Sequence, residues 1–205
     1  MPPTGRAELP QCDRWVICAS GPSMIYTDVA HLRRFRSWRV MVINNTWELI
    51  PWAHVLYACD FQWWARYGTA AEAFAGQKWT LSSAAQLRYG INRIERGQGA
   101  GLCTEPGHIN TGGNGGHQAI NLAWHMGAKR IVLLGYDMHR KNGGHWHGEH
   151  EGMLSAPESH INAWRRNFEP LANDMAKAGV SVINATTGTA LECFERMPMV
   201  EALKC

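Results

Sequence analysis

Residues 110–150 read NTGGNGGHQAINLAWHMGAKRIVLLGYDMHRKNGGHWHGEH, and this stretch decides the fold. It opens with a glycine-rich turn and a helix, and residues 131–134 (IVLL) then predict a strand that is apolar on both faces. Such strands are typical of parallel sheets that are covered by helices on both sides. The polar residues that follow, 135–150, are therefore expected at the carboxyl edge of the sheet, where open α/β folds bind ligands.

The rest of the chain alternates in the same way. Apolar runs predict strands at residues 15–20, 39–43, 54–59, 78–81, 91–94 and 180–183. Helices are expected at residues 24–35, 61–74, 83–89, 159–178 and 190–203. This alternation predicts one Rossmann-like α/β domain over residues 1–205, with a parallel sheet and helices on both faces. The glycine-dense segment around residues 97–110 is expected to act as a lid, with a solvated connector as the alternative.

The composition is that of a globular protein. Hydrophobic residues make up 45% of the chain and charged residues 18%, which argues against disorder. The apolar runs are too short to span a bilayer, and the polar start resembles no leader, so we expect a cytoplasmic protein without membrane contact. Six cysteines without CxxC spacing are interpreted as reduced thiols. A net charge of +3 suits an anionic ligand but falls short of a dedicated nucleic-acid binder.

Polar residues directly follow the first three predicted strands. The turn Gly21-Pro22-Ser23 comes after the first strand, Asn44 after the second and Asp60 after the third. A glycine lets backbone amides approach a ligand, and the helix start that follows such a turn suits phosphate. These residues are therefore expected to share one edge of the sheet, although Asn and Asp also serve simply to form turns.

The chain contains ten tryptophans, an unusual number for its length. Five of them fall near predicted strand ends, where an indole can stack on a base or a sugar ring: Trp47, Trp52, Trp63, Trp64 and Trp146. For any single one of these, packing in the core or at its rim is the favoured interpretation.

Several segments, taken in order, resemble a known superfamily. They are VICASGPSM, INN, YACD, TGGNGGHQAINLAWHMGAKRIVLLGYDM and SVINATTGTALECF, and they span residues 15–203. They resemble the bacterial sialyltransferases that use CMP-sialic acid, and the related family that contains the archaeal 6-hydroxymethylpterin diphosphokinase. Phage-encoded proteins with an HWHGEH-type loop are also similar. The resemblance implies a fold that binds a nucleotide or its phosphates, in enzymes of differing chemistry.

The resemblance also implies positions for individual residues. The GPS turn and Asn44 would lie beside the nucleotide phosphates, with Asp60 as a second polar contact. His139 would take the place of a phosphate-contacting tyrosine. The backbone of Thr111, Gly112 and Gly113 would line the base or ribose, and Asp137 is counted with these nucleotide contacts.

The loop after the central strand holds the histidines that bear on the reaction. The similar enzymes use one histidine in this interval as catalytic base, and this chain offers His145, His147, His150 and His160. A histidine titrates near neutrality and suits removal of a proton from an acceptor hydroxyl. We expect His147 or His150 to be the base, with His145 and His139 directed towards phosphate.

A metal site is the rival interpretation of this loop. His145, His147 and His150 have HxHxxH spacing, and His139, Asp137 or Glu149 would complete a shell for zinc or another divalent ion.

The function predicted from these features is that of a glycosyltransferase-like enzyme with a CMP-sugar or UDP-sugar donor. One alternative is a phosphotransferase of the pterin or nucleotide diphosphokinase type, and another is a non-catalytic nucleotide-binding or metal-binding phage accessory protein. The acceptor is left open between a glycan and a nucleic acid, and the formation of a homo-oligomer is also left open. The nucleic-acid variant depends on the basic run Arg33, Arg34, Arg36 and Arg39, which a solvated helix face also explains.

Overall fold

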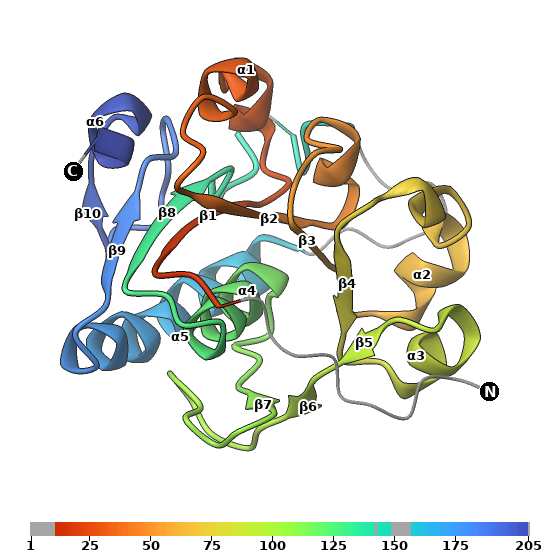
Figure 1. Cartoon of the computed structure of the whole chain (residues 1–205). Helices are drawn as coiled ribbons and strands as arrows, with labels where there is room; N and C mark the ends of the chain where they lie inside the picture. Colours follow the sequence, from red (N-terminus) through yellow and green to blue (C-terminus); the bar gives the residue numbers. More distant parts are fainter. Residues whose placement is uncertain (1–10, 142, 149–156, 205) are drawn as a thin grey trace.

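Eight parallel strands form the main sheet of the computed structural model, which describes residues 11–141, 143–148 and 157–204 (Figure 1). Across the sheet they run β10 (Glu195–Arg196), β9 (Ser181–Asn184), β8 (Arg130–Leu134), β1 (Arg14–Cys18), β2 (Arg39–Ile43), β3 (Val55–Tyr57), β4 (Gln77–Thr80) and β5 (Asn92–Arg93). A separate parallel pair consists of β6 (Glu95–Arg96) and β7 (His108–Ile109). The predicted single-domain α/β fold with a parallel sheet is confirmed.

Helices cover both faces of this sheet. On one face lie α4 (Gly115–His125) and α5 (Glu158–Lys177); on the other lie α1 (Val29–Leu32), α2 (Phe61–Tyr67), α3 (Ser83–Tyr89) and α6 (Met199–Lys204). Figure 1 shows α1 and α6 above the sheet and α4 and α5 below it. Along β1, Trp15 and Ile17 join the core under α4 and α5, whereas Val16 and Cys18 join the other core. Because successive side chains of a strand point to opposite faces, one continuous apolar run supplies both cores.

Three predicted helices are shorter than expected, and one of them, predicted at residues 61–74, ends at Tyr67 before the 3₁₀ turn η3 (Ala70–Ala73). The helix predicted at residues 24–35 is wrong, because the chain forms a 3₁₀ turn, η1 (Pro22–Tyr26), and then the separate short helix α1. Thr27 between them is extended, and the Asp28 carboxylate accepts a hydrogen bond from the His31 backbone N–H (2.8 Å), which caps a new helix. The helix predicted at residues 190–203 is also wrong in its first half, where β10 lies, and helix α6 begins only after Pro198.

The strand order places a topological switch point between β1 and β8. From β1 the chain adds strands outward to β5, then returns to place β8 on the other side of β1 and continues outward to β10. Cys18 at the end of β1 is paired with Val42 of β2 and with Leu134 of β8, so the residues after these strands share one edge. Open α/β sheets bind ligands in the crevice at such a point.

Candidate functional site

A cavity of about 310 Å³ opens at this carboxyl edge. Its walls are the segments that follow β1, β2, β3 and β8, the start of α4 and one side of α5. Among the predicted site residues, those that line the cavity are Gly21, Asn44, Asp60, Gly113, Asp137, His139 and His145. The described residues Pro22, Ser23, Thr111, Gly112 and His147 are not part of the lining, and His150 lies outside the described residues.

Asp137, which follows β8, holds the Gly-Pro-Ser turn in place. Its Oδ1 accepts a hydrogen bond from the Ser23 backbone N–H (3.0 Å), and its Oδ2 accepts one from the Ser23 hydroxyl (2.7 Å). Both residues are buried. Gly21 is required by the close approach, since a Cβ there would lie 1.9 Å from Asp137 Oδ2 and 2.4 Å from the Gly135 carbonyl oxygen. Both carboxylate oxygens of Asp137 therefore position the turn that borders the cavity.

The start of α4 faces the cavity with backbone rather than side chains. Gly113 has a φ of 74°, in the left-handed region that favours glycine. Asn114 caps the helix, because its Oδ1 accepts a hydrogen bond from the Gly116 N–H (2.8 Å). A Cβ at Gly116 would lie 2.6 Å from the Tyr136 ring, so only glycine fits there. The cap satisfies one of the amino-terminal N–H groups, and this end of the helix keeps partial positive charge that suits a phosphate.

Two cavity residues have an unusual backbone conformation. Among the described non-glycine residues, Asn44 (φ 50°) and Met138 (φ 53°) are those with positive φ, and both line the cavity. Such a conformation costs free energy and persists where the surrounding structure imposes it, most often at ligand sites. The next residue, Asn45, has a structural role, because its Oδ1 accepts a hydrogen bond from the Trp63 indole N–H (2.8 Å).

The histidine loop docks on the end of β1. The Trp146 backbone N–H donates to the Ser20 carbonyl oxygen (3.0 Å), and its indole N–H donates to the Thr46 hydroxyl (3.3 Å). His145 Nδ1 lies 3.1 Å from the Ser20 hydroxyl. The His145 and His147 rings are nearly parallel, with centroids 5.2 Å apart. The docking therefore presents His145 to the cavity, with the ring of His147 beside it.

His139 lines the cavity but is bound to backbone through both ring nitrogens. Its Nδ1 accepts a hydrogen bond from the Lys141 N–H (3.3 Å), and its Nε2 lies 3.0 Å from the Gly188 carbonyl oxygen. Because Nδ1 is the acceptor, Nε2 carries the proton and donates it to Gly188. A phosphate contact by this ring would require one of these bonds to break.

Two other titratable groups of the lining are unsuited to act as bases. Burial raises the pKa of the Cys59 thiol, and the neighbouring Asp60 carboxylate raises it further. Burial likewise raises the pKa of the Tyr136 hydroxyl, which donates to the Gly116 carbonyl oxygen (3.1 Å). Both groups stay protonated near neutrality.

Trp164 of α5 was not predicted as a site residue, yet it lines the cavity together with Ile161, one helical turn earlier. From the sequence it was indistinguishable from the apolar face of the helix. By contrast, none of the five tryptophans near the predicted strand ends lines this cavity, and Trp63 and Trp64 are buried in the core.

The segment at residues 97–110 lies apart from the cavity lining. It is tied down by Asn121, whose Oδ1 accepts from the backbone N–H groups of Cys103 and Asn110 (both 3.0 Å). The Leu102 N–H donates to the Asp174 carboxylate (3.2 Å). Its role as a lid stays a prediction.

The metal interpretation has no support from the described part of the chain, where no group of three His, Cys, Asp or Glu side chains is placed to hold an ion. Two of its proposed ligands, Asp137 and His139, are engaged by Ser23 and by backbone. Two others, His150 and Glu149, lie outside the described residues.

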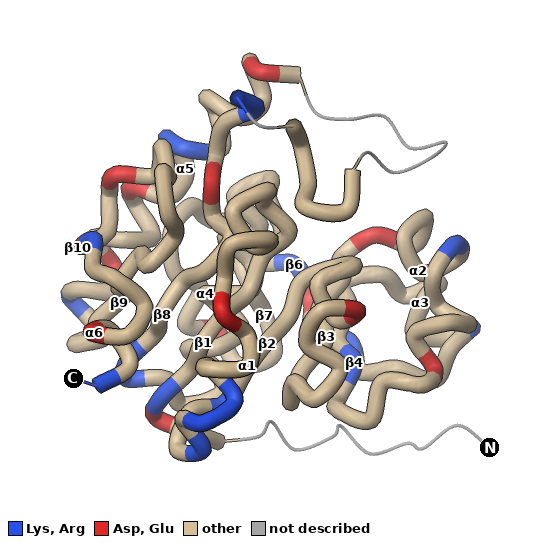
Figure 2. The backbone as a smooth tube through the Cα atoms, turned by 90° about the horizontal axis from the view of Figure 1, so that it is seen from above, with Lys and Arg blue, Asp and Glu red and all other residues tan. Residues whose placement is uncertain are grey.

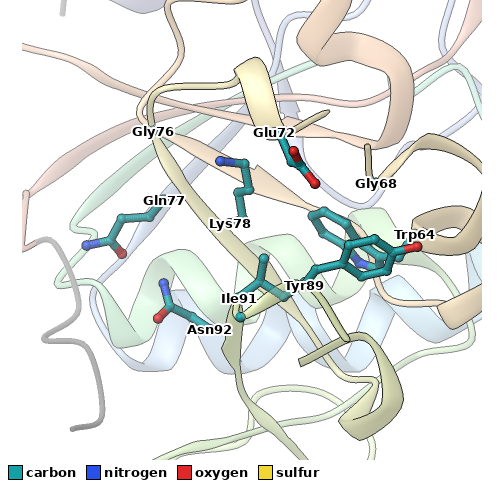
Figure 3. A pocket seen from close by; sticks show the side chains of 10 residues that line it. Trp64, Gly68, Glu72, Gly76, Gln77, Lys78, Tyr89, Ile91 and Asn92 are labelled. Atoms are coloured by element: carbon teal, nitrogen blue, oxygen red, sulfur yellow. The ribbon is translucent and has the colours of Figure 1, made fainter. Parts of the chain in front are cut away.

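A second cavity, of about 290 Å³, lies beside β4 and β5 (Figure 3). Glu72, Lys78 and Tyr89 line it, together with Gly68 and Gly90, which follow the last residues of α2 and α3. The carboxyl ends of helices carry partial negative charge, which disfavours a phosphate. The carboxyl-edge cavity is therefore the better candidate for an anionic ligand.

Comparison with known proteins supports the fold. No protein-family model and no curated protein sequence matches the chain. Among solved structures, the chain is similar to the MAf glycosyltransferase from Magnetospirillum magneticum AMB-1, with a TM-score of 0.63 and 11% sequence identity. The match covers 93% of this chain and 34% of that protein, so this chain spans about a third of its length. At this identity the likeness shows a shared fold.

The basic run lies away from the cavity. Arg33, Arg34 and Arg36 follow α1, and Arg39 begins β2, so this run belongs to the amino edge of the sheet (Figure 2). Any nucleic acid bound there would lie on the edge opposite to the cavity. Among the described residues, no helix combines the length and the apolar character that a membrane span needs.

Proposed function

We propose that the protein is a glycosyltransferase-like enzyme that uses a nucleotide-activated sugar, and that the carboxyl-edge cavity is its donor site. One observation carries the proposal. At the switch point of the sheet, the amino end of α4 opens into the cavity, and the Gly21 turn, whose N–H groups are bonded to Gly135 and Asp137, forms the adjacent wall. That arrangement suits the phosphates of a nucleotide. The fold shared with a glycosyltransferase favours sugar transfer as the chemistry.

The donor is expected to lie with its phosphates over Gly113 and Gly115, near Asn44. A volume of about 310 Å³ is at the lower end of the range for small-molecule sites. A cavity of this size suits one mononucleotide unit, with the transferred sugar extending towards the histidine loop.

In the proposed reaction, the bond between the anomeric carbon of the sugar and the phosphate oxygen breaks. The acceptor hydroxyl oxygen forms the new bond to that carbon, and the phosphate oxygen keeps the electron pair. The backbone N–H groups of the cavity stabilise the departing phosphate. We assign the base to His145, since it lines the cavity and His147 does not. If its Nδ1–H donates to the Ser20 hydroxyl, Nε2 is the nitrogen that takes the acceptor proton.

Nucleotide binding is tested by thermal shift with CMP, UDP, GDP, ATP and a pterin, each with and without divalent metal. A ligand at a hundred times its Kd stabilises the fold by about 2.7 kcal/mol. The absence of a shift with every nucleotide would refute the donor site. A shift that appears only with metal would revive the metal interpretation.

Catalysis is tested by release of nucleotide from CMP-sugars and UDP-sugars, with water or added acceptors, followed by anion-exchange chromatography. His145→Ala is expected to slow release by about 10²- to 10⁴-fold, the usual contribution of a general base. His108→Ala, outside the cavity, is the matched control. Full activity of the His145 variant would overturn the assignment, and nucleotide binding without any release would identify a binding protein instead of an enzyme.

A further inference from the structure

The walls of the carboxyl-edge cavity differ in chemistry. The edge of the sheet supplies backbone and polar side chains such as Asn44 and Asp60, whereas α5 supplies Ile161 and Trp164. Ile161 is 8% exposed, but the indole of Trp164 is only half-buried, so it is the aromatic surface that a ligand in the cavity meets. An indole presents a broad apolar face beside a polar site, as a flat aromatic ligand requires.

The indole is held in a fixed relation to the proposed phosphate site. The ideal Cβ position of Gly113 lies 3.0 Å from Trp164 Nε1 and 3.1 Å from Cδ1, so the indole edge packs against this glycine. One turn further along α5, the Asn167 side-chain amide donates to the Gly112 carbonyl oxygen (2.9 Å). Helix α5 thereby clamps the glycine turn that leads into α4, and it sets the distance between the aromatic face and the helix start.

We propose that Trp164 stacks on the base of the bound nucleotide. The nucleoside then extends from the amino end of α4 towards α5, and the transferred sugar points away from α5, towards His145. The inference rests on the proposed function, because it takes the ligand to be a nucleotide. Stacking on an indole is available to every base, so Trp164 supplies affinity for the nucleoside, and the choice among bases is made by other contacts.

The test compares a nucleotide with its base-free counterpart. Binding of CMP or UMP, whichever stabilises the wild type, and of ribose 5-phosphate is measured by isothermal titration calorimetry. Base stacking is worth about 1–3 kcal/mol, so Trp164→Ala and Trp164→Leu should weaken nucleotide binding by about 5- to 150-fold. Ribose 5-phosphate should bind the variants as it binds the wild type. Trp164→Phe should recover most of the nucleotide affinity. Trp52→Ala, which replaces a tryptophan outside the cavity, should change the affinity for neither ligand.

A second measurement identifies the stacking partner directly. A stacked base quenches indole fluorescence, so nucleotide should quench the wild type, and Trp164→Phe should lose that quenching while still binding. Equal losses for both ligands in Trp164→Ala would show that the indole only supports the glycine turn, and would overturn the inference. Weaker binding of the nucleotide-sugar alone, with free nucleotide unaffected, would overturn it as well, because the indole would then contact the sugar. Failure of the proposed function itself looks different: the wild type would bind neither nucleotide nor ribose 5-phosphate.

Discussion

Replacing Gly21 by alanine tests how tightly the β1 turn is packed against the segment after β8. The added Cβ would lie 1.9 Å from Asp137 Oδ2 and 2.4 Å from the Gly135 carbonyl oxygen. The backbone of Gly21 itself (φ −62°, ψ 153°) is open to alanine, so the cost comes from the collision and not from backbone strain. Either the Asp137 carboxylate swings away, or the two segments separate.

The size of the effect follows from the bonds that would be lost. If the carboxylate moves, Ser23 loses two charge-assisted hydrogen bonds, each worth about 1.5–3 kcal/mol. If the segments separate, the bond from the Gly21 N–H to the Gly135 carbonyl oxygen (3.0 Å) is lost too. Against this loss, alanine stabilises the protein by about 0.4–1 kcal/mol, because it lowers the conformational entropy of the unfolded chain. We expect a net loss of about 2–5 kcal/mol, which lowers Tm by about 5–15 °C in a domain of this size.

Thermal unfolding of four variants checks the prediction: Gly21→Ala, Gly115→Ala, Asp137→Ala and the double variant of Gly21 and Asp137. Gly115→Ala is the matched control, because it also lines the cavity but its Cβ would meet nothing closer than Ile43 Cγ2 at 3.5 Å, an ordinary contact. Its Tm should equal or exceed that of the wild type. In an Asp137→Ala background, Gly21→Ala should cost less than it does alone, since the nearest obstacle is gone. The close approach would be refuted if Gly21→Ala had the Tm of the wild type, or if it lowered Tm equally in the wild-type and Asp137→Ala backgrounds.

Three further outcomes are expected. Asp137→Asn should lower Tm, because the neutral amide replaces one accepting carboxylate oxygen by an NH₂ group and removes the charge that strengthens both bonds from Ser23. Asp60→Asn, at an exposed residue, should leave Tm unchanged, and equal Tm values for the two variants would contradict the positioning role. Burial lowers the pKa of His117 from 6.5 to about 4, so below pH 6.5 the unfolded chain takes up a proton that the folded chain refuses. The free energy of unfolding should therefore fall by about 3 kcal/mol between pH 6.5 and 4. Urea titrations at several pH values should show that it falls less with pH in His117→Gln. Asn121→Ala should speed proteolysis within residues 97–110 by removing the bonds that anchor this segment; protection by nucleotide would support a lid, and unchanged cleavage would contradict the anchoring role.

The sequence was sufficient for the central strands of the sheet and for the carboxyl edge where the cavity lies. Residues 131–134 are aliphatic on both faces, and such a run is typical of a parallel sheet covered on both sides. Because all strands of such a sheet run the same way, polar residues that follow them meet at one edge. Asn44 and Asp60 line the cavity for that reason.

The roles of the individual side chains could not be predicted from the sequence, because they depend on the partner that each side chain contacts in the fold. Asp137 and His139 follow the central strand as a ligand contact would, yet Ser23 engages the first and backbone engages the second. Trp164 is the opposite case, a residue of the cavity lining that the sequence pattern does not reveal. It lies at the cavity because α5 packs against Gly112 and Gly113. Helical spacing alone places it on the apolar face.

Asp137 opposes an anionic ligand, and its bonds to Ser23 weaken that repulsion. Two unit charges 4 Å apart interact by about 4 kcal/mol at a protein surface, so an unpaired carboxylate in this position would repel a phosphate strongly. Both oxygens of Asp137 instead accept hydrogen bonds from Ser23, which offsets part of its charge at the β1–β8 end of the cavity. Asp60, at the end of β3, is exposed, and its hydrogen bond comes from the weakly polar Cys59 thiol (3.1 Å). The phosphates of the proposed donor therefore belong over the start of α4, away from Asp60, where the partial positive charge of the helix end favours an anion.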